Sequence, residues 1–127
     1  MSLGLLKLFL IIFFLFINNS TKAEPVQKNI GLFKLLNKST NKVSQKKIFV
    51  NESAEWGTLN IELYACFSSP PNEIPENYAL ISVLDKLNKE KNDVYLGWII
   101  SSSPDITPLE HPIYDLWLVD CTNDKTS

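Results

Sequence analysis

The single histidine of the sequence, His111, is the side chain best suited to catalysis or metal binding, and two acids, Glu110 and Asp115, lie close to it. An imidazole beside carboxylates can act as a general base or as a metal ligand. A catalytic zinc ion, however, takes three protein ligands, usually with more than one histidine among them. Adjacent side chains on an extended segment also point in opposite directions. We therefore expect His111 to hydrogen-bond to the backbone and hold its loop, with acid–base catalysis as the alternative and no metal site.

Three serines, at positions 101, 102 and 103, precede His111 and could act as nucleophiles beside it. The sequence lacks the G-x-S-x-G elbow that holds such a serine on a strained turn. Its four glycines are not spaced as in a phosphate-binding loop. We predict that the protein is not an enzyme and binds no cofactor, and a hydrolase that uses His111 stays a remote alternative.

Aromatic side chains are the second group that could bind a ligand, because exposed rings stack on glycans and peptides. Trp98 and Trp117 lie in apolar runs typical of strands, so both are expected in the core. Trp56 lies in the polar segment 51–57 and is the tryptophan expected to be exposed. A binding module for cell-wall glycan or for a small molecule would use Trp56 together with tyrosines.

The two cysteines, Cys66 and Cys121, are expected to form a disulfide, since no Cys-x-x-Cys redox spacing exists and an exported chain can keep such a bond. The loop they would close spans about 55 residues, and in the chain-entropy model this stabilises the fold by about 4 kcal/mol. A chain of about 100 residues has a total stability of about 5–15 kcal/mol. The disulfide is therefore expected to supply a large part of it.

The elements that must position these residues are mostly strands. Apolar and polar residues alternate from Leu59 to Ala65, as in a strand with one buried face. Residues 78–84, 94–100 and 114–121 are rich in β-branched and aromatic residues and predict three more strands. In the strand at 114–121, the period of two places Cys121 on the same face as Trp117 and opposite to Leu118. Because both faces of this strand are apolar, we expect it to be central in its sheet.

Turn-forming residues separate two further apolar runs, 32–36 and 43–50, and predict a hairpin, with a short helix over 31–38 as the alternative. Prolines mark residues 68–77 and 101–112 as surface loops, and residues 24–30 are expected to form a flexible lead-in. The prediction is an all-β fold, a small antiparallel barrel or sandwich with one disulfide. It would form a single domain over residues 24–127, with its core at about 32–122.

The N-terminus has the pattern of a secretory signal peptide. One cation, Lys7, precedes ten apolar residues at 8–17, and a polar stretch then leads to Ala23. The apolar run is shorter than the roughly 20 residues that cross a bilayer. We expect cleavage after Ala23, with an uncleaved N-terminal anchor as the alternative, and no membrane span in the mature chain.

Charge excludes two classes of partner. Residues 1–23 contain two lysines and no acid, so the mature chain carries ten lysines against 14 acids, a formal charge of about −4. Nucleic-acid binding and electrostatic docking on anionic lipid both need clustered positive charge. The sequence also has no arginine, so it has no bidentate clamp for phosphate or carboxylate.

Two runs near the C-terminus, residues 96–104 and 109–121, resemble the signature of a family of small exported alphaproteobacterial proteins of unknown function. Further matches to that pattern are found at residues 36–43, 56–59, 66 and 70–71, so that the resemblance covers roughly residues 32–121. Asn37 stands where the family typically has an acid, and Asn41 where it often has glycine. The resemblance implies a Gram-negative periplasm and no assigned activity.

Together, these patterns favour a periplasmic, non-enzymatic interaction or accessory factor of the cell envelope, with a glycan or small-molecule binding module as the alternative. The partner would be an envelope protein or a cell-wall ligand. The candidate interaction surface comprises Trp56, Trp98, Ser103, Pro104, Glu110, His111, Tyr114 and Asp115. These residues bracket one loop and its flanking strands, which fits either a shared binding surface or a fold-defining corner.

The export signal leads to a direct test. Protein recovered from the envelope of the cells that make it should begin at Glu24, because signal peptidase removes residues 1–23. Intact mass and N-terminal sequencing measure this. Mature protein that still begins at Met1 would overturn the cleavage prediction and favour the anchor.

Overall fold

The computed structural model describes residues 2–17, 24–87, 93–102 and 109–124. The first element, α1 (Leu3–Ile17), is a helix of almost entirely apolar residues, and it matches the apolar run of the predicted signal peptide. No helix in the described part of the chain is long and apolar enough to span a membrane. The predicted cleavage site after Ala23 lies outside the described residues, so processing stays a prediction.

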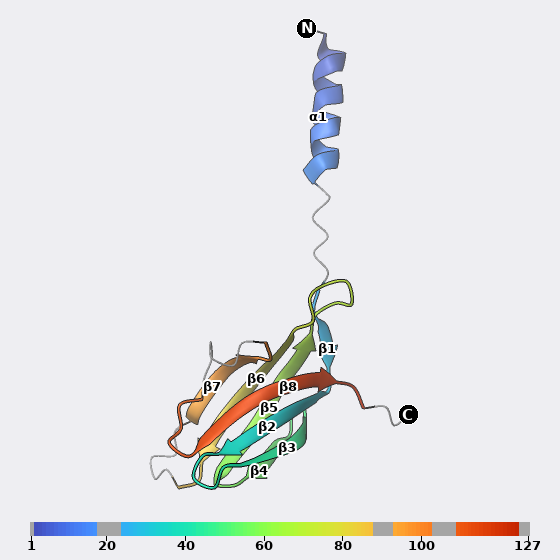
Figure 1. The fold of residues 1–127 in the computed structure, drawn as a ribbon. Helices are drawn as coiled ribbons and strands as arrows, with labels where there is room; N and C mark the ends of the chain where they lie inside the picture. Colours follow the sequence, from blue (N-terminus) through green and yellow to red (C-terminus); the bar gives the residue numbers. More distant parts are fainter. Residues whose placement is uncertain (1, 18–23, 88–92, 103–108, 125–127) are drawn as a thin grey trace.

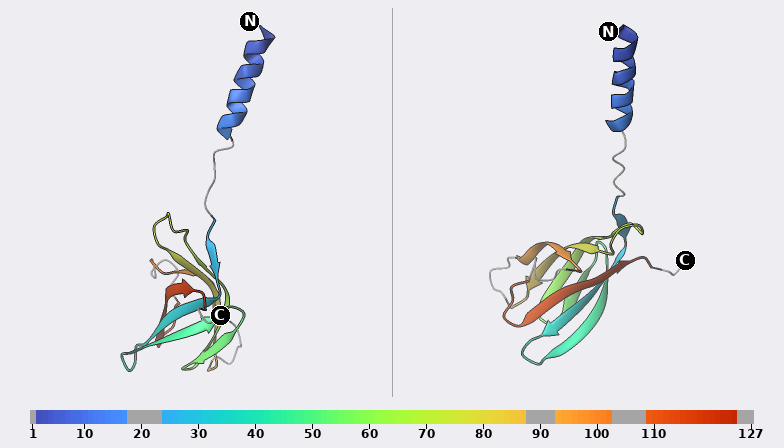
Figure 2. Two further views of the ribbon diagram at one scale, coloured as in Figure 1. Left: turned by 90° about the vertical axis from the view of Figure 1, so that its right-hand side faces the viewer. Right: turned by 45° about the horizontal axis from the view of Figure 1, so that its top comes forward.

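Within the described residues, eight antiparallel strands follow the helix (Figure 1). They are β1 (Val26–Lys28), β2 (Ile30–Asn37), β3 (Lys42–Phe49), β4 (Ser53–Trp56), β5 (Leu59–Ser68), β6 (Asn77–Asp85), β7 (Asp93–Ile100) and β8 (Tyr114–Thr122). One sheet has the order β1-β5-β6-β7, with β4 also paired to β5, and the other has the order β3-β2-β8. The all-β prediction is confirmed, and the two separate, facing sheets correspond to its sandwich alternative (Figure 2).

Residues 24–49 are more regular than their sequence suggested. The predicted hairpin is confirmed as β2 and β3, and Asn37 closes its turn by accepting the backbone N–H groups of Ser39 and Thr40. The helix alternative over 31–38 is wrong. Residues 24–30 are not a flexible lead-in either, because β1 pairs with the end of β5 and gains ladder hydrogen bonds there.

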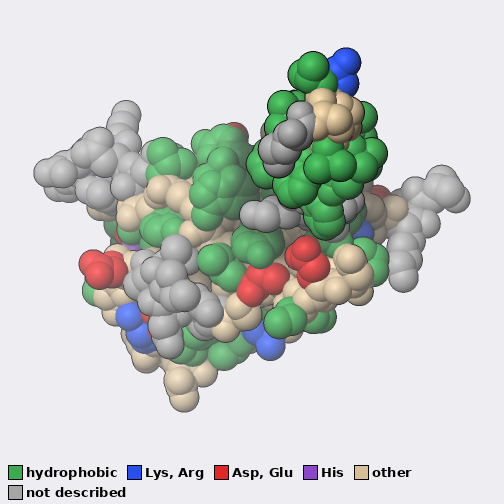
Figure 3. All heavy atoms as spheres, turned by 90° about the horizontal axis from the view of Figure 1, so that it is seen from above, with side chains coloured by type: hydrophobic (Ala, Val, Ile, Leu, Met, Phe, Trp, Pro, Cys, Tyr) green, Lys and Arg blue, Asp and Glu red, His purple; other side chains and the backbone are tan. Residues whose placement is uncertain are grey.

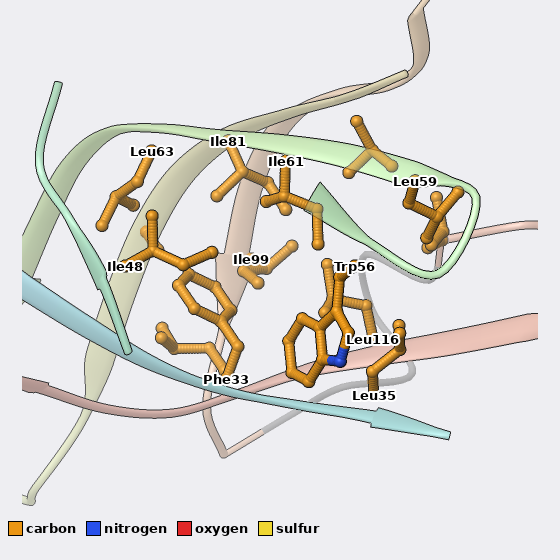
Figure 4. Close-up of a cluster of buried hydrophobic side chains, with 14 of the residues drawn as sticks. Phe33, Leu35, Ile48, Trp56, Leu59, Ile61, Leu63, Ile81, Ile99 and Leu116 are labelled. Atoms are coloured by element: carbon orange, nitrogen blue, oxygen red, sulfur yellow. The ribbon is translucent and has the colours of Figure 1, made fainter. Parts of the chain in front are cut away.

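The core lies between the sheets and is built by alternation along each strand. Phe33 and Ile48 of the smaller sheet face Ile61, Leu63 and Ile81 of the larger one (Figure 4). All five side chains are almost completely buried. Burial of a large apolar side chain contributes about 1.5–3 kcal/mol, so this double layer is the main source of attraction between the sheets.

For two tryptophans, Trp56 and Trp98, the sequence predicted the wrong burial. Trp56 was expected to be exposed but is 8% exposed, because the short strand β4 pairs with β5 and directs the indole between the sheets. There its Nε1 donates a hydrogen bond to Ser44 Oγ at 2.9 Å. Trp98 was expected in the core but is 44% exposed, because its neighbour Ile99 takes the inward face of β7. Trp117 is half-buried.

A register shift in β5 turns Cys66 toward the core. Leu59, Ile61 and Leu63 point inward at every second residue, and the pairing with β6 then skips Tyr64. Such a β-bulge adds one residue to one strand and reverses the faces of all residues beyond it. Cys66 is therefore fully buried, three residues after Leu63 rather than two.

A second β-bulge lies in β8. Its pairing with β2 skips Val119, so Cys121 shares the inward face with Leu118, and the prediction that it shares a face with Trp117 is wrong. The predicted disulfide Cys66–Cys121 is confirmed, with the two Cα atoms 5.7 Å apart. It joins β5 of one sheet to β8 of the other. β8 is also not central, because it ends the order β3-β2-β8.

Removal of this cross-link should lower stability sharply. The variant Cys66→Ala/Cys121→Ala is expected to lose about 4 kcal/mol of unfolding free energy, because a loop of 55 residues regains its freedom in the unfolded chain. Denaturant titration monitored by tryptophan fluorescence measures this. Reduction of the unmodified protein serves as the control and should produce a similar loss. A loss below about 1 kcal/mol in both would contradict the structural role.

Candidate functional site

His111 is buried and uses both ring nitrogens within the protein. Its side chain lies between the start of β8 and the end of β6, and the residue is 7% exposed. Nδ1 accepts the backbone N–H groups of Ile113 and Tyr114, at 3.0 and 3.2 Å. Nε2 lies 2.7 Å from Oδ2 of Asp85. Because Nδ1 is an acceptor, the proton of the neutral ring belongs on Nε2, from which it is donated to the Asp85 carboxylate.

Asp85, the last residue of β6, is the acidic partner in this arrangement. The hydrogen bond from His111, and then the backbone N–H of Leu87 at 3.0 Å, hold the pKa of Asp85 below its ordinary value. An ionised carboxylate that accepts several hydrogen bonds in a partly buried site is stabilised in its charged form. The Asp85–His111 pair therefore links the end of β6 to the entry of β8.

Tyr114 extends the link to the turn between β4 and β5. Its ring packs against the imidazole of His111 with the centroids 5.1 Å apart, and its hydroxyl accepts the backbone N–H of Thr58 at 3.3 Å. Gly57 has a φ of 61°, and a Cβ on it would lie 2.5 Å from the hydroxyl oxygen of Tyr114. This position requires glycine for both reasons.

Lys38 connects the turn between β2 and β3 to the segment around His111. Its ammonium group donates to the carbonyl oxygen of His111 at 2.7 Å and lies 3.6 Å from the carboxylate of Asp115. Its backbone N–H also donates to the carbonyl of Ile113. We call the set formed by Lys38, Gly57, Asp85, His111 and Tyr114 the histidine corner. It joins four separate parts of the chain, as a fold-defining corner would.

The histidine corner does not have the arrangement of a hydrolytic site. A general base needs a free lone pair, and the one lone pair of the neutral ring, on Nδ1, already accepts two N–H groups. Ser101 and Ser102 donate instead to the carboxylate of Glu76, beside the start of β6. That end of β6 lies about 26 Å from Asp85, at about 3.3 Å per residue. Among the described residues, no His, Cys, Asp or Glu side chains form a group that could hold a metal ion.

Glu76 has a local structural role of its own. Burial raises the pKa of its carboxyl, but hydrogen bonds from Ser102, Ser101 and the backbone of Asn77 outweigh this effect and leave the pKa below its ordinary value. Glu76 thus holds the exit of β7 against the start of β6.

The described residues of the predicted interaction surface differ in their exposure. Trp56, His111 and Tyr114 are buried, Asp115 is half-buried and Glu110 is exposed. Trp98 is exposed on the outer face of the larger sheet, away from the core. Ser103 and Pro104 lie outside the described residues.

The outer face of β5, β6 and β7 carries apolar side chains that the sequence did not place there. The pairing register aligns Phe67 with Tyr78 and Ile100, and aligns Leu80 with Trp98. Residues directly opposite on neighbouring strands lie on the same side of a sheet. We call this set, together with the exposed residues Tyr64 and Leu96, the outer aromatic face. Leu96 is 62% exposed and Tyr64 39%.

A shallow depression of about 340 Å³ lies on this face, lined by Pro25, Phe67, Tyr78 and Trp98. The rings of Phe67 and Trp98 are tilted, with centroids 6.1 Å apart. In the space-filling view, hydrophobic side chains gather over the part of the domain that carries β6 and β7 (Figure 3). The outer face of the smaller sheet differs, because Lys34, Lys47 and other charged residues lie along it.

The sequence carried only an ambiguous signal for this face. Residues 94–100 are apolar or glycine at every position, so their alternation does not reveal which side is buried. The small Gly97 was the one hint, since it shares the inward side with Ile99 and leaves room for the ring of Tyr95. Only pairing with β6 decides that Leu96 and Trp98 point outward.

Comparison with known proteins places the chain in a family. The family described as "Uncharacterized protein conserved in bacteria (DUF2155)" matches residues 31–121, and the chain belongs to it. A protein of Rickettsia prowazekii (strain Madrid E), "Uncharacterized protein RP359", is 28% identical over 105 residues, which cover 82% of this chain and 68% of the relative. No solved structure matches this chain.

The histidine corner predicts a specific dependence of stability on pH. The folded-state pKa of Asp85 is lowered, so its contribution is complete above the unfolded pKa of about 3.9 and is lost as the pH falls through the folded value. Asp85→Asn should cost about 1–3 kcal/mol at pH 7 and flatten the loss of stability below about pH 4. Thermal unfolding between neutral and acid pH measures both effects.

The matched control is Glu110→Gln, because this carboxylate is exposed and adjacent to His111 in sequence. Its unfolding curves should follow those of the unmodified protein at every pH. If Asp85→Asn gives the same acid profile as this control, the Asp85–His111 pair does not stabilise the corner.

Proposed function

We propose that this DUF2155 protein is a non-enzymatic factor of the bacterial cell envelope that binds a partner protein through its outer aromatic face. The observation that carries the proposal is the exposure of Leu96, Trp98 and Tyr64 on the outer face of the larger sheet. Soluble monomers rarely expose such a patch unless it meets a partner. Export to the periplasm is part of the proposal, and the apolar N-terminal run and the disulfide support it.

The chemistry of the face favours an apolar partner surface. Glu62 is the one charged residue on it among the described side chains of β5, β6 and β7, and the hydroxyl of Tyr64 donates to its carboxylate. At the depression lined by Phe67, Tyr78 and Trp98, a charged or polar partner would lose hydration without gaining new hydrogen bonds. Aromatic residues are enriched at the centres of protein interfaces, where they supply much of the binding free energy.

A glycan is the weaker candidate for the same surface. Sugar sites place polar groups beside an aromatic ring to bind hydroxyls. The depression is lined instead by the ring and aliphatic atoms of Pro25, Phe67, Tyr78 and Trp98. The second aromatic site considered from the sequence, at Trp56, is buried, and its indole nitrogen is already bonded to Ser44.

We propose that the protein is not an enzyme, because the side chains that could catalyse a reaction are already hydrogen-bonded within the fold. His111 has no free nitrogen, and Ser101 and Ser102 are bonded to Glu76 at the far end of β6. These groups hold the fold together, which leaves an apolar surface rather than a reactive centre as the feature able to act on other molecules.

Crosslinking in the cells that make the protein tests this proposal. The full chain, tagged after Ser127, is captured with its crosslinked partners and identified by mass spectrometry. Trp98→Ala should weaken capture of the partner about 30-fold, since a central aromatic residue contributes about 2 kcal/mol or more. Trp117→Ala is the matched control, because Trp117 is a half-buried tryptophan on the other sheet.

A partner lost with Trp98→Ala and retained with Trp117→Ala supports the proposal. Equal capture by both variants shows that the outer aromatic face is not the binding surface. If no envelope protein is captured by the folded, exported chain, and wall fragments quench the fluorescence of Trp98, the glycan alternative replaces it.

A further inference from the structure

A second hollow lies where the hairpin of β2 and β3 faces the turn between β4 and β5. Its volume is about 290 Å³, and its lining includes Leu35, Thr40, Lys42, Ser44, Trp56 and Tyr114. We call it the hairpin pocket. A cavity of about 150 Å³ accommodates benzene, so the hairpin pocket has room for one ring together with a small polar group.

One part of the lining is apolar and buried. It consists of Leu35 from β2, Trp56 from β4 and Tyr114 from β8. Trp56 lies beside Leu35 at one end of the core (Figure 4). Its indole is held from β3, because Nε1 donates to Ser44 at 2.9 Å and the ammonium of Lys46 lies 5.7 Å from the ring centroid. A ring that is already fixed loses little side-chain entropy when a ligand packs on it.

The wall formed by β3 is polar on the side that faces the core. Ser44 pairs with the buried residue Leu35 of β2, so its side chain lies on the inward side of the smaller sheet. Lys42 and Lys46 share this side because side chains alternate along a strand. The same side carries the buried Ile48 farther along β3. Inward charges on a border strand discourage edge pairing, and here they also stand beside a hollow with a buried aromatic wall.

The polar groups of the hairpin pocket are donors that lack acceptors. The hydroxyl of Ser44 accepts the indole N–H of Trp56, and its own proton remains to be donated. The hydroxyl of Tyr114 likewise accepts the N–H of Thr58. Among the described residues, no group accepts either hydroxyl proton and no acid pairs with Lys42. Lys42 is also the one charged residue that lines the hollow.

We propose that the hairpin pocket binds a small organic carboxylate whose body is apolar, such as a single ring or a short branched chain. The carboxylate accepts hydrogen bonds from Lys42 and from the hydroxyls, and the body packs on Trp56 and Leu35. Charge-assisted hydrogen bonds of this kind are stronger than neutral ones. A cationic ligand would meet the ammonium of Lys42. A phosphate would find neither an arginine nor a second free ammonium in the lining.

This site goes beyond the proposed function. β4 lies at one border of the larger sheet and β7 at the other, so the hairpin pocket and the outer aromatic face are on different parts of the domain. The two sites have no residue in common. A small carboxylate can therefore occupy the hairpin pocket without covering Trp98.

Titration of the purified, exported protein with phenylacetate at neutral pH tests the site. The indole N–H resonance of Trp56, assigned with the variant Trp56→Phe, should shift as phenylacetate is added. We expect a Kd of about 1 mM or below, since phenylacetate has about ten non-hydrogen atoms. Phenylacetamide has nearly the same shape but no charge, and it should bind about fivefold more weakly or worse.

Lys42→Met removes the ammonium and keeps most of the aliphatic stem. It should weaken phenylacetate binding about fivefold or more and leave phenylacetamide binding unchanged. Lys47→Met is the matched control, because it makes the same charge change on the same strand but on the outer side, opposite Leu32. This control should bind phenylacetate as the unmodified protein does.

Three results would overturn the proposal: equal affinity for phenylacetate and phenylacetamide, an equal loss in both lysine variants, or no shift of the Trp56 resonance up to about 10 mM phenylacetate. Partner capture through Trp98 is measured separately, so either proposal can fail alone.

Discussion

The structure depends on two β-bulges that bring Cys66 and Cys121 to the same place between the sheets. Strict alternation would put each cysteine on the outer face of its strand, where the two sulfur atoms could not meet. The bulges at Tyr64 and Val119 reverse both faces, so the disulfide forms inside the core. The two sheets are then fixed to each other by a covalent bond as well as by apolar packing.

The histidine corner is the counterpart of the disulfide at the other end of β8. β8 crosses β6 in the opposite direction, so its start lies near Asp85 and its end near Asn77, whose side chain accepts the N–H of Cys121. The strand is therefore held at both ends, by hydrogen bonds to an ionised carboxylate at one and by sulfur at the other. β8 is a sheet border that pairs along its length with β2, and these two attachments also fix it to the opposite sheet across the core.

The titratable residues hold the fold together, and for this reason our proposal gives them no part in a reaction. His111, Asp85 and Glu76 satisfy one another and nearby backbone groups, so their charges and lone pairs are already in use. What remains exposed on the described part of the larger sheet is a set of apolar side chains on the outer face of β5, β6 and β7. Such side chains gain free energy by leaving water, which is the physical basis of the binding role that we propose for this surface.

The sequence by itself predicted the all-β class, the hairpin at residues 37–42 and the disulfide pair, because alternation, turn residues and cysteine number are local or countable signals. It did not determine the faces of Cys121, Trp56 and Trp98. Side-chain direction in a strand has a period of two, and one inserted residue reverses it. Whether a bulge occurs depends on pairing with a distant strand, so only the tertiary structure decided which aromatic residues are buried and which remain available to a partner.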